Sequence, residues 1–440
     1  MRQHSVTLDK DKCRGCTNCL KRCPTEAIRV RQGKAVITSE RCIDCGECIR
    51  VCPYHAKVAV TDRLESIGDF KYAIALPAPA LYGQFKGLTD INNVLSALLD
   101  IGFDDVFEVA RAAELVSAAV AERIAEHKAG ENRGPLISSA CPAIVRLIQV
   151  RFPELIKNIV DVEAPMEVAA LLARRDFCAR TGAKPEEVGC FFISPCAAKK
   201  TAVMNPLGRE ASDVNGVISL MDVYACLNVQ VTQQATIKGL HTASALGVGW
   251  ANSGGEAAAS SCENTLAVDG VFNVIHALEE IENNKMSDLD FFEGLACTAG
   301  CVGGPLTFEN PFVAKTRVRK LAKALPRIAP TDTVSAEELH ALPIGLTQKI
   351  PANSALALDA NLADALRMMG RIDEIVLDLP GLDCGSCGSP TCRALAEDIV
   401  RGAASQMSCI VLMKDKVQSM ARDMLDIAQS RAKNHGENKS

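Results

Sequence analysis

Two cysteine-rich runs near the N-terminus decide the first part of the fold. They read Cys13-Arg-Gly-Cys16-Thr-Asn-Cys19-Leu-Lys-Arg-Cys23-Pro24 and Cys42-Ile-Asp-Cys45-Gly-Glu-Cys48-Ile-Arg-Val-Cys52-Pro53. Both have the spacing C-x2-C-x2-C-x3-C-P, in which three thiolates two residues apart can bind three corners of a cubane cluster from one tight loop. A pair of zinc knuckles is the alternative, but zinc sites rarely place four cysteines so closely and then repeat them with the proline. The repeat therefore predicts two iron–sulfur clusters.

Over residues 1–60 this module resembles bacterial two-cluster ferredoxins. The resemblance implies that the fourth cysteine of each run ligates the cluster of the other run. One cluster would then be held by Cys13, Cys16, Cys19 and Cys52, and the other by Cys42, Cys45, Cys48 and Cys23.

The composition of the whole chain limits the classes of protein to which it can belong. Of its 440 residues, 48% are hydrophobic and 23% charged, which suffices for an ordinary folded core. The net charge of −5 argues against a nucleic-acid partner. No run reaches the ~18 apolar residues of a membrane span, and residues 1–5 contain no apolar signal region, so we expect a cytoplasmic protein without a membrane partner. In a reducing compartment, the 20 cysteines are metal ligands or catalytic groups rather than a disulfide framework.

A second group of cysteines lies near the C-terminus, at Cys384, Cys387, Cys392 and Cys409. Residues 393–403 predict a helix ended by Gly402, so three loop cysteines and one beyond the helix can close a four-ligand site. Structural zinc is the alternative. The stretch from Asp383 to Arg393 resembles the small four-iron domain of several redox and sensory proteins, which implies another [4Fe-4S] cluster.

The central part of the chain alternates between strand-like and helix-like segments. Strands are predicted at 72–76, 104–110, 135–138 and 189–194, and helices at 91–101 and 111–127. This alternation predicts βαβ units with a largely parallel sheet, and therefore an α/β fold.

Four central cysteines stand where such a fold binds ligands. Cys141 and Cys196 each follow an apolar run at a strand-to-helix turn, beyond the carboxyl end of the strand. There, helix N-terminal amides stabilise thiolate sulfur. If the turn between them is helical, Cys297 and Cys301, four residues apart, share one face of it, while the glycines around them leave room for a large cofactor. These four cysteines suffice for one more cubane.

Three segments around these cysteines resemble the active-site signatures of [FeFe]-hydrogenases. They are Ser139-Ala140-Cys141-Pro142, Ser194-Pro195-Cys196-Ala-Ala-Lys199-Lys200 and Gly294-Leu295-Ala296-Cys297-x3-Cys301-x-Gly-Gly, and the stretch from Gly249 to Glu256 resembles a glycine motif of the family. The similarity runs from about residue 71 to 312.

The resemblance implies a complete site. Cys141, Cys196, Cys297 and Cys301 would hold the active-site cubane, and Cys301 would bridge to a diiron unit that carries CO, cyanide and an azadithiolate. Lys199 would lie near a cyanide ligand, whereas outside this motif Lys199 and Lys200 would be read as a solvated face. The implied reaction is H2 = 2 H⁺ + 2 e⁻, with maturation proteins and a redox partner such as ferredoxin.

The sequence also departs from the family pattern. The cysteine that passes protons in typical members is replaced by Ala140, and the relay glutamates of the family fall at Val120 and Arg123. Methionines that flank the diiron site are replaced by Ser194 and Leu295, and no acidic residue follows the second signature around Thr201. Because proton relays contribute about 10²–10⁴-fold, we expect slow turnover. The pattern resembles the divergent branch of the family to which a sensory role is ascribed.

The remaining features concern assembly and packing. Residues 410–427 carry Ile410, Met413, Val417, Met420, Met424 and Ile427 at a 3-4-3-4-3 spacing, which is a coiled-coil seam for a signalling partner or a homodimer. The alternative is that this stripe packs on its own domain. Cys178, Cys190 and Cys226 are expected in the core, and Cys262 near the cofactor is a weaker hypothesis.

Together these features predict an α/β protein. It comprises a ferredoxin-like 2[4Fe-4S] module (1–68), a two-lobed α/β hydrogenase domain with mainly parallel sheets (69–325), a linker that wraps around it (326–365), a small helical [4Fe-4S] domain (366–412) and a helical tail (413–440). The expected function is H2 oxidation or proton reduction, slow and with a sensing or regulatory role. The alternatives are a hydrogenase-like assembly protein and an electron-transfer protein, each without the diiron unit.

Overall fold

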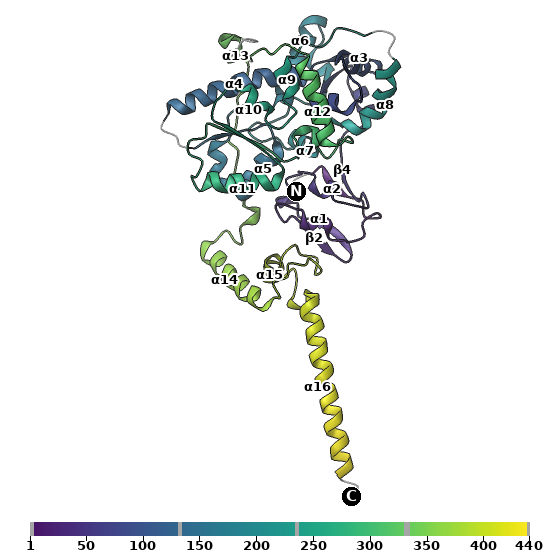
Figure 1. Ribbon diagram of the computed structural model, residues 1–440, viewed down its shortest axis with the longest axis vertical. Coiled ribbons are helices and arrows are strands. Elements are labelled where there is room, and N and C mark those ends of the chain that lie inside the picture. Colours follow the sequence, from purple (N-terminus) through teal and green to yellow (C-terminus); the bar gives the residue numbers. More distant parts are fainter. Residues whose placement is uncertain (1–3, 131–133, 234–236, 330–334, 438–440) are drawn as a thin grey trace. The chain divides into compact units, whose positions relative to one another are not determined.

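The computed structural model describes residues 4–130, 134–233, 237–329 and 335–437. The chain divides into two compact units, and each is described separately. Unit 1 comprises residues 1–7, 39–50 and 57–354, and unit 2 comprises residues 8–38, 51–56 and 355–440. Figure 1 shows the elements of both units. In the described part of the chain, no helix is long and apolar enough to cross a membrane.

Unit 1 is built on two parallel sheets. The first has the strand order β6-β5-β8-β9, and the second has the order β10-β11-β7. The strands of the first sheet are β5 (Tyr72–Pro77), β6 (Asp105–Val106), β8 (Val188–Ser194) and β9 (Gly216–Ser219). Those of the second are β7 (Leu136–Ile137), β10 (Thr265–Asp269) and β11 (Phe291–Leu295). All these pairings are parallel, so the predicted α/β class is confirmed.

Helices cover both faces of these sheets, as parallel strands require. They are α3 (Asn92–Asp100), α4 (Val109–Ala129), α5 (Pro142–Arg151), α6 (Pro165–Thr181), α7 (Ala197–Met204), α8 (Leu220–Gln233), α9 (Ala245–Gly249), α10 (Gly255–Ala259), α11 (Val271–Glu282), α12 (Pro311–Lys323) and α13 (Ala336–Ala341).

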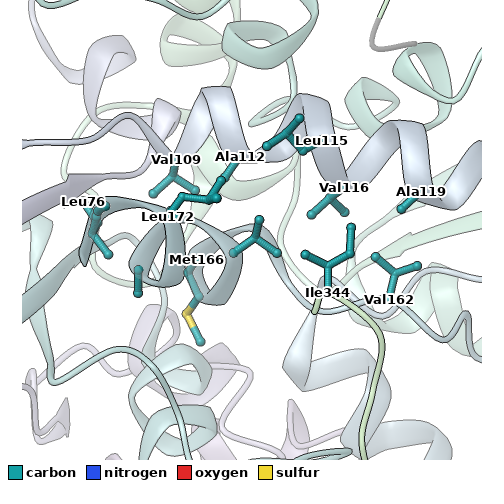
Figure 2. Close-up of a cluster of buried hydrophobic side chains, with 14 of the residues drawn as sticks. Leu76, Val109, Ala112, Leu115, Val116, Ala119, Val162, Met166, Leu172 and Ile344 are labelled. Carbon is teal, nitrogen blue, oxygen red and sulfur yellow. The ribbon is translucent and has the colours of Figure 1, made fainter. Parts of the chain in front are cut away.

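The alternation of side chains along each strand sorts the core into separate clusters. Ile74 and Leu76 of β5 point into the cluster that contains α4 and α6, whereas Ala73 and Ala75 point to the opposite face, with α3 and α12. Figure 2 shows the first cluster, to which α4 contributes Val109, Ala112 and Val116 and α6 contributes Met166 and Leu172. The first sheet is therefore the middle layer of an α/β/α sandwich.

The segment after α12 returns to this core. Ile344 is 6% exposed and belongs to the cluster in Figure 2, and its carbonyl oxygen accepts a hydrogen bond from Glu163 N at 2.7 Å. The predicted linker therefore contains residues that fill the hydrophobic core.

Two pieces of the N-terminal cysteine module also belong to unit 1. They contain α2 (Glu47–Arg50) and the loop with Cys42, Cys45 and Cys48. Strand β1 (Val6–Leu8) pairs with β4 (Lys57–Ala59). The buried Asp44 accepts a hydrogen bond from Val6 N at 3.0 Å, which fixes the loop to the strand.

Unit 2 combines the first cysteine run with the C-terminal region. Strand β2 (Ile28–Arg31) forms a hairpin with β3 (Lys34–Ile37), and the positive φ angles of Gln32 and Gly33 match its two-residue turn. Helix α1 (Asn18–Lys21) precedes the hairpin. The C-terminal elements are α14 (Leu362–Asp378), α15 (Cys392–Val400) and α16 (Ile410–Glu437). Helix α16 is the long yellow helix in Figure 1.

Several local predictions differ from the structure. The segment 104–110 forms a strand only at Asp105–Val106, and α4 already begins at Val109 because Glu108 turns to accept hydrogen bonds from Tyr82 and His241. The boundary expected at residues 365 and 366 lies inside α14. Its apolar face packs against α15, as the shared cluster of Ile372 and Leu395 shows, so α14 belongs to the C-terminal region.

Candidate functional site

The four central cysteines line one cavity in unit 1. The wall of this cavity is mostly apolar and includes Cys141, Cys196, Cys297 and Cys301. The elements that lead to it are the carboxyl ends of β5, β7, β8 and β11, which come from both parallel sheets. Such strand ends are where ligands bind in α/β proteins.

Cys141 and Cys196 occupy equivalent positions at the start of a helix. Cys141 is the N-cap residue of α5, and Cys196 is the N-cap residue of α7. Burial raises the pKa of Cys141, while the backbone amides of Ala296 and Ile144 oppose this shift. Burial, with Cys297 and Cys141 nearby, raises the pKa of Cys196 to about 12. Both thiols are therefore neutral at physiological pH unless a metal replaces the proton.

Cys297 and Cys301 are joined by a turn that is not α-helical, so the two cysteines do not share one face of a helix. Ala299 has a φ of 68° and Gly300 a φ of 98°, and Gly300 N donates to Cys297 O at 3.1 Å. This left-handed turn still directs both thiols into the cavity, and burial raises the pKa of Cys301 well above its usual range.

The glycines of this segment have a more specific role than leaving room for a cofactor. A Cβ atom at Gly304 would lie 2.1 Å from Pro195 O, and one at Gly303 would lie 2.1 Å from Thr298 O. A Cβ at Gly300 would lie 2.5 Å from Ser253 N. The glycines therefore let the cysteine-bearing segments pack backbone to backbone, although Gly300 and Gly304 also line the cavity.

The other residues of the signatures lie in different places. Lys199 lines the cavity and its Nζ donates to Ala140 O at 2.9 Å, whereas Lys200 forms an ion pair with Asp62 at 2.7 Å. Ala140 and Leu295 are buried in the cavity wall. The fully buried Ser194 is not among the residues that line the cavity. Its Oγ accepts a hydrogen bond from Cys196 N at 3.0 Å and so supports the turn.

The second ferredoxin-like loop packs beside the same site within unit 1. Ile43 shares a hydrophobic cluster with Ile144 and Ala198, and Cys45 packs against it. Arg50 Nη2 donates to Gly303 O at 2.8 Å. Burial disfavours the charged form of Arg50, but the nearby Cys297 and Glu47 outweigh it and hold the pKa of Arg50 above its ordinary value. A cationic side chain thus links the loop to the cavity.

Two buried carboxyl groups lie behind Ala140. Ser138 Oγ donates to Glu256 Oε2 at 2.5 Å, and Ala140 N donates to the same Ser138 Oγ at 3.2 Å. Glu256 Oε1 has no hydrogen-bond partner among the described residues. Glu293 accepts from Gly254 N at 3.0 Å and from Ala257 N at 2.8 Å. Burial and the neighbouring Glu293 raise the pKa of Glu256, and burial raises the pKa of Glu293.

Sequence reasoning missed some of these residues. Glu293 is an acidic residue inside the five-residue strand β11. An acidic residue within a short apolar strand is the sequence feature that could have identified Glu293 as a site residue. Met166 supplies a thioether to the cavity wall, although the sequence analysis found methionines missing there. Val120 and Arg123, where the family's relay glutamates were placed, do not line the cavity: Val120 is fully buried in the core and Arg123 pairs with Glu126 on the surface.

The other cysteines fall into two groups. Cys190 and Cys178 pack in the core as expected, but Cys226 is exposed on α8, so the core prediction for it is wrong. Helix α8 turns that side chain outward because its buried residues are Val223 and Leu227. Cys262 packs at the edge of the core and does not line the cavity.

In unit 2 three cysteines of the two N-terminal runs lie near backbone amides. Ala35 N donates to Cys13 Sγ at 3.5 Å, Ala56 N donates to Cys52 Sγ at 3.3 Å, and Ala27 N donates to Cys23 Sγ at 3.2 Å. Such N–H···S bonds are typical surroundings for cluster-bound thiolates. Cys387, Cys392 and Cys409 belong to one hydrophobic cluster, whereas Cys384 is exposed.

Comparison with known families assigns three segments of the chain. Residues 71–305 match the family described as "Iron only hydrogenase large subunit, C-terminal domain". Residues 5–53 match a "4Fe-4S dicluster domain", and residues 379–411 match an "Fe-S cluster" family. The chain therefore carries iron–sulfur domains on both sides of the α/β region.

Individual relatives agree with this assignment. The periplasmic [Fe] hydrogenase large subunit of Nitratidesulfovibrio vulgaris strain Hildenborough is 32% identical over 219 residues, which are 46% of this chain and 52% of the relative. Iron hydrogenase 1 of Clostridium pasteurianum is 24% identical over 249 residues, which are 50% of this chain and 43% of the relative. The chain thus spans about half the length of the curated relatives it matches.

A solved structure supports the fold. The structure of HydA(deltaEFG), described as revealing stepwise [FeFe]-hydrogenase H-cluster assembly, superimposes with a TM-score of 0.50 at 15% identity and covers 64% of this chain and 94% of that one. At this identity the likeness establishes the fold alone.

The raised pKa of Glu256 predicts a specific dependence of stability on pH. Between pH 4.5 and about 8, the folded protein binds a proton at Glu256 that the unfolded chain has lost, so stability falls as pH rises through this window. Glu256→Gln should remove this loss and make the protein more stable than its parent at pH 8, by roughly 1–3 kcal/mol, with little difference at pH 4.5.

Denaturant unfolding followed by the fluorescence of Trp250, the only tryptophan of the chain, measures this effect. The exposed Glu263→Gln serves as the control and should follow the parent at both pH values. A Glu256→Gln protein that loses stability with pH as steeply as the parent would contradict the assignment.

Proposed function

The chain belongs to the family of iron-only hydrogenase large subunits, and on that premise we propose that it interconverts H2 with protons and electrons in the cavity of unit 1. The observation that carries the proposal is the convergence of four cysteines from the strand ends of two sheets on one mostly apolar cavity. Four thiols are a ligand set for a [4Fe-4S] cluster, because soft sulfur donors suit iron–sulfur clusters.

The residues of the cavity fit the complete family cofactor. Cys141, Cys196, Cys297 and Cys301 would hold the cubane, and Cys301 would also bind the diiron unit with its CO, cyanide and azadithiolate ligands. When bound, this group supplies the redox chemistry of hydrogen. The apolar wall around Leu295 and Met166 excludes water, and an ammonium at Lys199 suits an anionic ligand.

Electrons and protons need separate routes. The loop with Cys45 and Arg50 lies beside Cys297, which supports electron transfer between the second ferredoxin cluster and the cavity. On the proton side, Ala140 offers no titratable group. We infer that Ser138, Glu256 and Glu293 take over proton movement behind Ala140, because they are buried, neighbouring and able to bind a proton at neutral pH. Since no thiol connects them to the cavity, this route is slow, which suits a sensing or regulatory role.

Infrared spectroscopy of the anaerobically matured protein tests the proposed function. We expect absorption bands of metal-bound CO and cyanide, and an iron content of about 18 per chain, with 4 × 4 from four cubanes and 2 from the diiron unit. Absence of these bands after loading with the diiron cofactor, with about 16 iron per chain, would contradict the proposal and support an electron-transfer or assembly protein.

Ala140→Cys should raise the turnover of H2, within the about 10²–10⁴-fold range of a proton relay. Film electrochemistry of the matured protein measures this rate. Glu256→Gln should slow the Ala140→Cys variant at least as much as it slows the parent, because the new thiol connects the cavity to the same buried carboxyl group. Ala140→Ser, which has a similar size but a much weaker acid, is the control. An Ala140→Cys protein no faster than the parent would contradict the assignment of Ala140 as the missing relay.

Helix α16 supports a proposal about assembly. Its a and d side chains between 410 and 427 are all exposed, so in unit 2 the seam does not pack on its own domain. We propose that a second copy of the chain covers it in antiparallel orientation. Three kinds of apolar pair then form, each twice because the dimer is symmetric. They are Ile410 with Ile427, Met413 with Met424, and Val417 with Met420 of the other copy. Lys416 and Asp423 both occupy g positions of the heptad, so in an antiparallel dimer Lys416 of one copy faces Asp423 of the other. In a parallel dimer, Lys416 would face Ala421 and Asp423 would face Ala428.

Light scattering at low ionic strength tests this pairing. The full chain should have twice the mass of one chain, and a chain ending at residue 412 should be monomeric. Lys416→Asp should weaken the dimer by placing like charges together, and Lys416→Asp with Asp423→Lys should restore it. Lys414→Asp, which faces Ala421, is the control. A double variant that associates no better than the single variant would contradict the antiparallel arrangement.

A further inference from the structure

The C-terminal cysteine loop in unit 2 packs directly on the first ferredoxin-like run. Val30 N of β2 donates to Gly388 O at 2.8 Å. Lys21 Nζ, at the end of α1, donates to Pro390 O at 2.7 Å and also to Asp383 O. The loop thus gains backbone and side-chain hydrogen bonds from a segment more than 350 residues away in the sequence.

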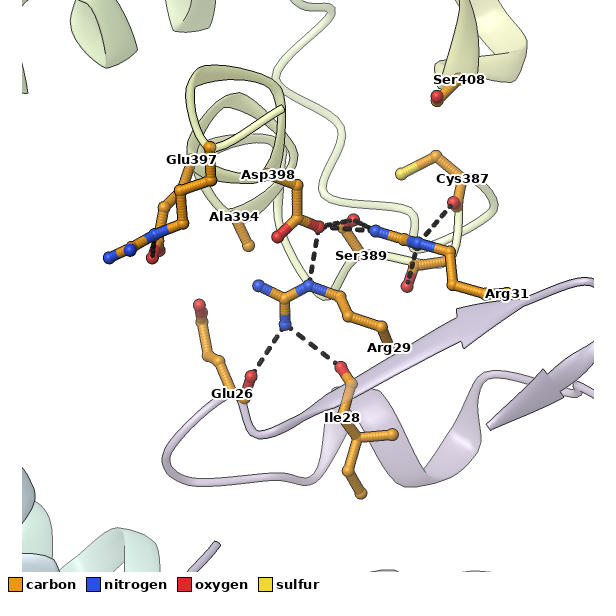
Figure 3. Close-up of polar contacts among 12 residues, drawn as sticks. Glu26, Ile28, Arg29, Arg31, Cys387, Ser389, Ala394, Glu397, Asp398 and Ser408 are labelled. Carbon is orange, nitrogen blue, oxygen red and sulfur yellow. Dashed lines mark hydrogen bonds and ion pairs between the residues drawn. The ribbon is translucent and has the colours of Figure 1, made fainter. Parts of the chain in front are cut away.

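Asp398 of α15 is the centre of this contact (Figure 3). Its Oδ2 accepts hydrogen bonds from Arg29 Nε at 2.7 Å, from Arg31 Nη2 at 2.7 Å and from Ser389 Oγ at 2.8 Å. The Asp398 side chain is only 11% exposed. A buried carboxylate that loses its cationic partners is strongly destabilising, so these arginines fix the position of α15 against β2.

The backbone of the loop leaves no space at this contact. A Cβ atom at Gly388 would lie 2.0 Å from Val30 O, and one at Gly385 would lie 2.9 Å from Lys21 Cε. Both glycines also have positive φ angles, at 81° and 76°, which glycine adopts without strain. At Gly388 the two segments therefore pack backbone to backbone, and at Gly385 the loop leaves room for the side chain of Lys21.

This approach brings together two predicted sets of cluster ligands. Leu20 follows Cys19 directly, and its Cδ1 lies 3.5 Å from the position that a Cβ at Gly385 would occupy. Gly385 in turn follows Cys384. The Leu20 side chain and the Gly385 backbone are in contact between the two loops. On the outer side of the C-terminal loop, Cys384 and Leu382 are exposed.

We propose that Cys384, Cys387, Cys392 and Cys409 hold the outermost cluster of the electron-transfer chain, and that Asp398 clamps it against the first ferredoxin cluster. This rests on the proposed function for the direction and source of the electrons. Each H2 yields two electrons and two protons, and the electrons leave one at a time. In each step the first ferredoxin cluster is oxidised by one electron and the C-terminal cluster is reduced by one. The C-terminal cluster then reduces an external one-electron carrier protein at the exposed face of the loop, and no bond or proton moves.

Asp398→Asn and Gly388→Val test the clamp in the cluster-loaded full chain. Asp398→Asn keeps the shape of the side chain and removes its charge, while Gly388→Val places a side chain where Val30 O now lies. Asp373→Asn is the matched control, because Asp373 pairs with Arg393 on the exposed side of the same region. Hydrogen exchange at the Val30 amide reports docking of the loop. Electron paramagnetic resonance of the fully reduced protein reports magnetic coupling between the C-terminal cluster and its neighbour.

We expect the parent and Asp373→Asn to show a protected Val30 amide and a coupled, fast-relaxing C-terminal cluster. Both test variants should lose the protection and the coupling while their iron content stays at the parent value. If the Val30 amide loses its protection while the magnetic coupling stays unchanged, the proposed electron transfer between the two clusters is overturned. If the Val30 amide stays fully protected in both variants, the proposed role of Asp398 in docking the loop is overturned. A parent without a C-terminal cluster, shown by missing iron, would also overturn the proposal. Because the coupling requires only cubane clusters, failure of the diiron assignment appears separately, in the infrared spectrum.

Discussion

Four thiols share one apolar cavity, and the rest of the structure depends on this constraint. Burial raises the pKa of Cys141, Cys196 and Cys301, so as thiolates they would be costly unless a metal compensates their charge. The fold meets the constraint by ending parallel strands of two sheets at the same place. Two of the cysteines begin helices there, and backbone amides, among them those of Ile144 and Lys199, oppose the rise in their pKa. The remaining two occupy a left-handed turn whose glycines allow backbone to pack on backbone.

The same principle of close backbone approach recurs in unit 2. There the C-terminal loop reaches β2 through Gly388, and a buried carboxylate between two arginines holds the contact. In unit 1, Arg50 links the second ferredoxin-like loop to Gly303 beside the cavity. In both cases a cationic side chain next to a cysteine loop fixes the distance between two predicted cluster sites. Electron transfer would then depend on a few charged contacts rather than on large interfaces.

Local features of the site could be read from the sequence, and features that need the folded chain could not. Cysteine spacing is readable because cluster geometry constrains ligands that are close in sequence, and Cys141 and Cys196 stand at the predicted strand ends. The conformation of the turn between Cys297 and Cys301 could not be read, because a four-residue spacing does not distinguish a helical turn from one with positive φ. Met166 and the Asp398 contacts arise from segments far apart in sequence. Glu293 was missed because an acidic residue inside a short apolar strand gains meaning only when its neighbours are known.

The replacement at Ala140 changes the chemistry of the site without loosening its backbone. Ala140 O accepts a hydrogen bond from Lys199, and Ala140 N donates to Ser138. Both backbone groups of the residue are therefore satisfied by partners that do not require a thiol. The loop that carries Cys141 therefore does not need a thiol at residue 140, and under the proposed function the replacement would affect proton movement rather than the binding of a cluster. Since Ser138 also binds Glu256, the hydrogen bond that holds the loop is the one that leads to the buried carboxyl pair. Under the proposed function, a site that keeps four converging cysteines while protons pass slowly would suit a response to hydrogen rather than its consumption.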